Sequence, residues 1–148
     1  MLGGWDAWLL SSVGGLDSAV NGSTGGWADI IVRVAPAAIT TLRKASYKKL
    51  TRFGEVSLDW RFQAGKFTST LSLPVGTRAT VHTPSVLREG GVDYGVRSIT
   101  ESAQLLWARD STSSSALEVG GVFSVQQAAA AVLTEVGSGS YLFEAQYA

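Results

Sequence analysis

The chain has 148 residues, 45% of them hydrophobic and 16% charged, which is typical of one folded domain and excludes an extended disordered chain. Its twelve basic and twelve acidic residues cancel, so the sequence provides no overall positive charge for nucleic acid or an anionic membrane surface, and we expect neither as a partner. The absence of cysteine excludes a disulfide framework and a thiolate metal site, and no apolar run reaches the roughly 18 residues that cross a membrane.

An amphipathic helix is expected at the start of the chain, from Trp5 to Val13. Its large apolar side chains recur at the spacing of one helical face, namely Trp5, Trp8, Leu9 and Val13. A helix of about nine residues is marginal by itself, so this face must pack against a neighbour. Residues 16–26 read as a loop rich in Gly and Ser, with an Asn21-Gly22-Ser23 sequon that a secretory pathway could glycosylate. We therefore divide the chain into an N-terminal region, residues 1–26, and a β-sandwich domain, residues 27–148.

Two strands and a basic segment are expected next. Residues Trp27 to Val34 are nearly continuous in apolar character and predict a strand buried on both faces, which Pro36 ends. The segment from Ile39 to Tyr47 predicts a weaker strand. The basic residues around its end are Arg43, Lys44, Lys48, Lys49 and Arg52. A polyanion-binding patch is one interpretation of this group, but a solvated strand edge is favoured, because the chain has no wider positive excess.

The segment from Gly54 to Pro84 shows the clearest pattern in the chain. Its apolar residues alternate with polar ones at the period of a half-buried strand: Val56, Leu58, Trp60 and Phe62, then Phe67, Leu71 and Leu73, then Ala79 and Val81. Breaks at Ala64-Gly65 and at Pro74-Val75-Gly76 separate the three runs. We expect a three-stranded antiparallel meander whose apolar face is covered by a second layer.

Turn signals divide the rest of the chain into short strands. Residues 85–95 read as a loop around Gly90-Gly91, and residues 111–115 read as a polar turn. Further strands are expected at residues 96–99, 103–107, 119–125, 128–136 and 140–146. Gly137-Ser138-Gly139 predicts a hairpin between the last two, while the alanines at 128–131 leave a helical turn open as an alternative. Eight to ten short strands indicate an all-β fold, an antiparallel β-sandwich or jelly roll with one short N-terminal helix.

No constellation of residues in the sequence indicates a catalytic or metal site. His82 is the single histidine and lies in the polar register of its strand, where we expect a surface side chain. The twelve carboxylates include no paired motif of the kind that glycoside hydrolysis requires, so we expect no catalytic residue, no metal ligand and no cofactor. Among the tryptophans, Trp60 is expected in the core, and Trp107 is the weak candidate for an exposed carbohydrate-binding aromatic.

Several segments, taken in their order along the chain, carry a family resemblance. They are Trp27–Pro36 (WADIIVRVAP), Lys44–Tyr47 (KASY), Gly54–Trp60 (GEVSLDW), Leu71–Val81 (LSLPVGTRATV) and Glu135–Phe143 (EVGSGSYLF). This succession resembles the C-terminal β-sandwich of bacterial-type α-L-rhamnosidases, glycoside hydrolase family 78. The opening segment Gly3–Leu9 (GGWDAWL) resembles the last helix of that family's (α/α)6 catalytic barrel.

The resemblance implies a domain that packs on a helical catalytic domain and carries no catalytic residue itself, since the catalytic acids of such enzymes lie in the barrel. Our first hypothesis is therefore a non-catalytic accessory domain with a structural or interaction role, whose partner is the missing (α/α)6 domain. One alternative is a carbohydrate-binding module, which needs exposed aromatic side chains and polar partners in a groove.

The other alternative is a self-assembling structural protein, a homo-oligomer or filament. Its contact would involve the apolar face of the first helix, that is Trp5, Trp8, Leu9 and Val13. The start Met1-Leu2-Gly3-Gly4 lacks the basic, apolar pattern of a secretory signal, so the compartment stays open, an extracellular one included.

Overall fold

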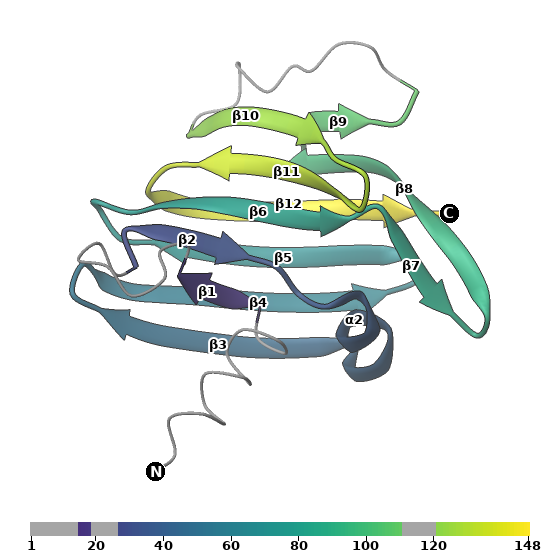
Figure 1. Ribbon diagram of the computed structural model, residues 1–148, viewed down its shortest axis with the longest axis horizontal. Helices are drawn as coiled ribbons and strands as arrows, with labels where there is room; N and C mark the ends of the chain where they lie inside the picture. Colours follow the sequence, from purple (N-terminus) through teal and green to yellow (C-terminus); the bar gives the residue numbers. More distant parts are fainter. Residues whose placement is uncertain (1–14, 19–26, 111–120) are drawn as a thin grey trace.

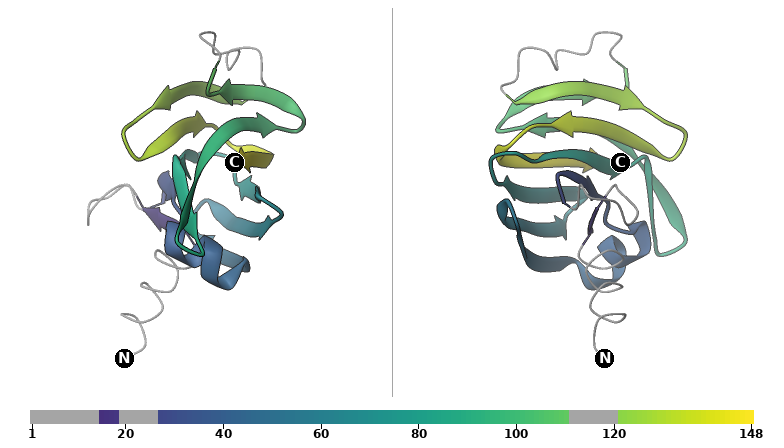
Figure 2. Two further views of the ribbon diagram at one scale, coloured as in Figure 1. Left: turned by 90° about the vertical axis from the view of Figure 1, so that its right-hand side faces the viewer. Right: turned by 60° about the vertical axis from the view of Figure 1, so that its left-hand side comes forward.

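The structure is a computed structural model, and it describes residues 15–18, 27–110 and 121–148. In these residues two β-sheets pack face to face as a sandwich (Figure 1). Figure 2 shows the sheets from the side, with helix α2 (Pro36–Leu42) at the end of the molecule away from β9 (Gln104–Ala108) and β10 (Val122–Gln127). The predicted all-β sandwich is therefore confirmed. The helix predicted from Trp5 to Val13 and the sequon at Asn21 lie outside the described residues.

The smaller sheet has five strands and the larger sheet has seven. In spatial order the smaller sheet contains β1 (Leu16–Ser18), β2 (Asp29–Val32), β6 (Arg78–Pro84), β11 (Ala131–Val136) and β10. The larger sheet contains β3 (Lys44–Thr51), β4 (Gly54–Gln63), β5 (Lys66–Leu73), β12 (Gly139–Tyr147), β8 (Val92–Glu101) and β7 (Val86–Glu89), and β9 also pairs with β8. The described pairs are antiparallel except for β2 and β6, which run parallel.

Apolar side chains from both sheets meet in one core between them. The seven residues predicted to share this core are between 0 and 5% exposed, namely Val56, Leu58, Trp60, Phe62, Leu71, Leu73 and Val81. The Trp60 ring lies 5.9 Å from the ring of Phe67. Phe62 meets Tyr147 edge to face at 6.4 Å. Because burial of one large apolar side chain contributes about 1.5–3 kcal/mol, this layer is the main source of stability.

The alternation predicted for the central segment is confirmed, but its topology as a three-stranded meander is wrong. β4 and β5 form an antiparallel hairpin through the turn at Ala64-Gly65, as predicted. β6 instead crosses to the smaller sheet, where it lies between β2 and β11. Strands of opposite sheets both turn their apolar faces to the core, so the buried positions of Ala79 and Val81 are compatible with either sheet.

A second predicted hairpin, at Gly137-Ser138-Gly139, is also a crossing between the sheets. β11 ends beside β6 in the smaller sheet, whereas β12 begins beside β5 in the larger one. Conversely, residues 85–95, expected as a loop, contain the hairpin of β7 and β8 with its turn at Gly90-Gly91. Both glycines have positive φ, which a two-residue hairpin turn requires and which Gly adopts without steric cost.

Helix α2 occupies residues where the sequence predicts the start of a strand, Ile39–Tyr47. Pro36 stands in the first turn of the helix, where its missing N–H removes no hydrogen bond and its fixed φ favours the helical conformation. Ile39 is fully buried under this helix. The helix ends at Arg43, which adopts the left-handed backbone conformation. The Arg43 backbone N–H donates to the Ile39 carbonyl at 3.2 Å. The expected strand therefore begins only after this cap.

The region around the smaller sheet's edge differs from expectation in two further places. Leu16–Ser18, expected in a loop, forms β1, and Leu16 belongs to the core. The strand expected from Trp27 to Val34 is shorter, because Trp27 has a positive φ of 63° and β2 begins only at Asp29. In the larger sheet β3 is an edge strand with exposed lysines, which agrees with the strand-edge interpretation of the basic segment.

Candidate functional site

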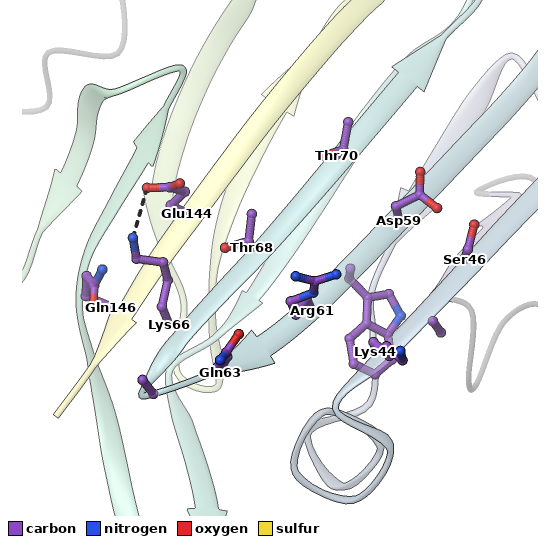
Figure 3. A pocket seen from close by; sticks show the side chains of 13 residues that line it. Lys44, Ser46, Asp59, Arg61, Gln63, Lys66, Thr68, Thr70, Glu144 and Gln146 are labelled. Atoms are coloured by element: carbon purple, nitrogen blue, oxygen red, sulfur yellow. Dashed lines mark ion pairs between the residues drawn. The ribbon is translucent and has the colours of Figure 1, made fainter.

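An open groove of about 950 Å³ lies on the outer face of the larger sheet, over β3, β4, β5 and β12 (Figure 3). Most of its lining side chains are polar or charged: Lys44, Ser46, Asp59, Arg61, Gln63, Lys66, Thr68, Thr70, Glu144 and Gln146. These residues come from strands that are distant in the sequence. The groove therefore exists only once the sheet is assembled.

The polar register of each strand directs these side chains away from the core. In β4, Asp59 and Arg61 alternate with the buried Trp60. Strand pairing aligns the polar positions in rows, because Arg61 lies opposite Thr68 and Thr68 lies opposite Glu144. The Cβ atoms of directly opposed residues are about 4.5–5.5 Å apart, so the side chains of one row are within reach of a single ligand.

The charges of the groove are only partly matched. Lys66 and Glu144 form an ion pair, with 3.6 Å between Nζ and Oε2 (Figure 3). Lys44 lies opposite Arg61, so two cations are neighbours across the strands. Neither cation has a side-chain hydrogen bond or ion pair with another described residue, although Asp59 is the next outward-facing residue along β4. Like charges in directly opposed positions destabilise a sheet, which makes this pair unusual.

The two carboxylates of the groove, Asp59 and Glu144, come from strands that are not neighbours in the sheet. β5 separates their strands, and they lie in different rows, which places their Cα atoms about 12 Å apart from strand spacing and rise. The partner of Glu144 is Lys66, which lies in the row on the side away from Asp59. Glycoside hydrolysis uses two carboxyl groups that flank the scissile bond, whereas Glu144 is held here in an ion pair with Lys66.

The residues singled out from the sequence lie away from the groove or outside the described chain. Trp107, on β9, is half buried against the core and does not line the groove. Trp60 is in the core, as predicted, and is 3% exposed. The predicted assembly contact, formed by Trp5, Trp8, Leu9 and Val13, lies outside the described residues.

The sequence analysis does not predict the groove, although the alternation of polar and apolar residues indicates which side chains point outward. The outward direction of Asp59 follows from the alternation in β4. The same alternation places Thr68 and Glu144 on outward positions of β5 and β12. What the sequence did not reveal is the register that lines these positions up, because β12 pairs with β5 across more than sixty residues of chain.

His82 is half buried on β6, in a more enclosed position than the surface site predicted for it. Burial lowers the pKa of His82 below its ordinary value of 6.5, and the positive charge of Arg33 lowers it further.

Within residues 15–18, 27–110 and 121–148, no group of three or more His, Asp or Glu side chains is placed to hold a metal ion. The helix in that part of the chain lacks the length and apolar character that crossing a membrane requires.

The chain is similar in fold to solved glycoside hydrolases. The alpha-L-rhamnosidase from Dictyoglumus thermophilum matches with a TM-score of 0.69 and 22% identity, over 97% of this chain and 13% of that chain. The Streptomyces avermitilis alpha-L-rhamnosidase complexed with L-rhamnose matches with a TM-score of 0.62 and 20% identity, over 93% of this chain and 10% of that one. This chain therefore spans only a small share of the length of either enzyme.

Sequence comparison adds the family. No curated protein sequence is significantly similar to the chain. Residues 19–97, more than half of its length, match the family model of the bacterial alpha-L-rhamnosidase C-terminal domain. The match covers the hairpin of β4 and β5 and the crossing to β6, so it includes the centre of both sheets. The chain belongs to the family of bacterial alpha-L-rhamnosidase C-terminal domains.

Proposed function

We propose that this chain acts as a non-catalytic accessory domain of an alpha-L-rhamnosidase-type protein, with a structural or interaction role. The observation that carries the proposal is the family match of residues 19–97 to the C-terminal domain of such an enzyme. The fold supports it, because nearly the whole chain matches a segment that makes up 13% of a rhamnosidase. A larger catalytic domain is then the natural partner of this domain.

One end of the sandwich offers apolar surface for such a partner. Leu50, 79% exposed, is the penultimate residue of β3, and Val75, 86% exposed, lies in the connection from β5 to β6. These two segments are neighbours in space, since a Cβ added at Gly76 would meet the Phe53 ring at 3.2 Å. Exposed apolar side chains on neighbouring segments support a contact with another domain at this end of the sandwich.

The proposal is tested first by assaying hydrolysis. We expect the purified chain to release nothing from an aryl α-L-rhamnoside, while an active alpha-L-rhamnosidase in the same assay does. Single acid-to-amide substitutions provide the control, Asp59→Asn and Glu144→Gln in the groove among them, because genuine turnover should depend on one of the twelve carboxylates of the chain. Hydrolysis that one of these substitutions abolishes would overturn the proposal.

The structural role is tested in a larger enzyme. Deleting the segment of the Dictyoglumus thermophilum enzyme that matches this chain should lower the melting temperature of the remainder. Since the deleted segment would hold no catalytic group, the folded remainder should keep its turnover at low temperature. An unchanged melting temperature would remove the structural role.

A further inference from the structure

We propose that the groove on the outer face of the larger sheet binds a saccharide that carries a carboxylate, and that Arg61 and Lys44 hold this carboxylate. The choice of a saccharide as the ligand class rests on the proposed function in a rhamnosidase-type protein. The preference for a carboxylate rests on the groove itself.

The first argument is the placement of Lys44 and Arg61. The two residues are direct partners in the pairing of β3 with β4, on the outer face of the sheet. No carboxylate of the described residues forms an ion pair with either cation, and Asp59, the next outward-facing residue along β4, supplies one negative charge beside the two positive ones. An anion between the two cations would turn their mutual repulsion into two favourable interactions. The planar guanidinium of Arg61 suits a carboxylate, which it can bind through two parallel hydrogen bonds.

The second argument is the neutral, hydrogen-bonding character of the rest of the groove. The ion pair of Lys66 and Glu144 cancels the charge on the side of β12. Thr68 lies between this pair and Arg61 in the same row. Gln63 lines the groove next to them and carries both a donor and an acceptor. Hydroxyl groups of a sugar ring donate and accept hydrogen bonds, so they match this set of side chains.

The third argument concerns the kind of recognition that the surface allows. A volume of about 950 Å³ lies in the range of small-ligand sites. Trp60 is the one aromatic residue among the described residues that line the groove, and it is 3% exposed, so none of these residues offers a ring for stacking on a sugar. Binding must then depend on charge and hydrogen bonds. A neutral sugar would leave the two cations with Asp59 as their one neighbouring negative charge, whereas a uronic acid would supply a second.

The test is isothermal titration of the full chain with an oligomer of galacturonic acid. The matched probe is the methyl ester of the same oligomer, in which the carboxylates are neutral. We expect the acid to bind and the ester to bind at least about tenfold more weakly, since hydrogen bonds to charged groups are the stronger ones. Binding of the acid should also weaken as the salt concentration rises.

Single substitutions locate the site. Arg61→Gln should weaken binding of the acid by about tenfold or more, and Lys44→Gln by roughly three- to tenfold, because an ammonium group is a point charge. Lys48→Gln is the matched control for Lys44→Gln. Lys48 is exposed on β3, as Lys44 is, carries the same charge and does not line the groove. Its affinity should stay within about twofold of the wild type. The melting temperature of each variant shows that it is folded.

Three results would overturn the proposal. These are equal binding of acid and ester, equal losses in Lys48→Gln and Arg61→Gln, and binding of oligoglutamate as tight as that of the acidic sugar. The last result would indicate a surface for an acidic protein segment. None of them bears on the proposed function, whose non-catalytic part is decided by rhamnoside hydrolysis and whose structural part is decided by the stability of the truncated enzyme.

Discussion

The connection from β4 to β5 and the connection from β5 to β6 are neighbours in the chain, yet they have opposite outcomes. The first, at Ala64-Gly65, keeps both strands in the larger sheet. The second, starting at Pro74, carries the chain across the core to the smaller sheet. Three strands with one alternating pattern are thus divided between two layers. The alternation of apolar and polar residues indicates which side chains face the core. The connection between two strands determines which sheet the second strand joins.

The two connections also differ in what holds them. Ala64 and Gly65 both have positive φ, the conformation of a tight hairpin turn between paired strands. In the crossing, the Thr77 hydroxyl donates to the Pro74 carbonyl at 2.7 Å. The crossing from β11 to β12 has a similar device, because the Tyr141 hydroxyl donates to the Gly137 carbonyl at 2.8 Å. The turn at Ala64-Gly65 is therefore set by backbone conformation, whereas these two crossings are also held by a side-chain hydroxyl.

The largest effect is expected from residues of the shared core. Trp60→Ala should lower the free energy of unfolding by about 3–5 kcal/mol, and Val81→Ala by about 1–3 kcal/mol, because both leave a cavity between the sheets. Arg61→Ala, next to Trp60 but on the outer face, should change it by less than about 0.5 kcal/mol. Urea unfolding measures all three. An unchanged midpoint for Val81→Ala would show that β6 does not pack on the core that β4 covers.

The next effect concerns the turns of the hairpins. Gly65→Ala should cost about 1–2 kcal/mol, since φ is +74° and the new Cβ would meet the Tyr147 carbonyl oxygen at 3.0 Å. Gly90 also has a positive φ of +60°, but no atom lies within 4 Å of an added Cβ. Gly90→Ala should therefore lose stability only through the strained backbone conformation and not through a steric contact. Thermal unfolding should therefore rank Gly65→Ala as the more destabilised. The reverse order would contradict the close approach of the C-terminal strand to this turn.

A smaller effect is expected from the crossings. Thr77→Val and Tyr141→Phe should each lower the free energy of unfolding by about 0.5–1.5 kcal/mol, because each removes the donor of a hydrogen bond to a connection carbonyl. Thr70→Val is the matched control for Thr77→Val, since Thr70 is an exposed threonine on the outer face of β5, the strand that precedes the crossing. Equal stability of Thr77→Val and Thr70→Val in urea would mean that the hydroxyl does not hold the crossing.

The smallest effect is a pH dependence that belongs to β6, the strand that crosses. Burial and the charge of Arg33 lower the pKa of His82 in the folded state below 6.5, while the unfolded chain keeps the ordinary value. The unfolded state therefore binds the proton first as the pH falls. The contribution of His82 to stability is complete above about pH 6.5 and is lost as the pH falls towards the lowered pKa.

This dependence is measured as the difference between the wild type and His82→Gln in urea unfolding from about pH 7.5 to pH 5. The difference isolates His82, because the carboxylates titrate alike in both proteins. The wild type should lose more stability than the variant over this range. Parallel curves would show that His82 titrates on the surface, as the sequence suggested.

The sequence predicts the outward direction of several single residues of the candidate site, but it does not predict that they lie next to one another. The alternation around Trp60 directs Asp59 and Arg61 outward, and the basic segment indicates that Lys44 lies on a strand edge. Their juxtaposition requires the register that sets Lys44 against Arg61, and the far wall requires Glu144 from the last strand. Such register depends on contacts between distant segments, which local periodicity does not contain.

Local sequence patterns were enough to predict the all-β class, the seven buried residues of the central segment, the hairpin at Ala64-Gly65 and, through the ordered segments, the family. The packing of the two sheets, in contrast, determines that β6 and β12 join sheets different from those of their predecessors in the chain. It also decided that residues 36–42 are helical, since the buried Ile39 and the Pro36 start outweigh a β-branched sequence. The reason is the same in both cases: periodicity selects the face that is buried, while the partner that buries it is chosen by packing across the core.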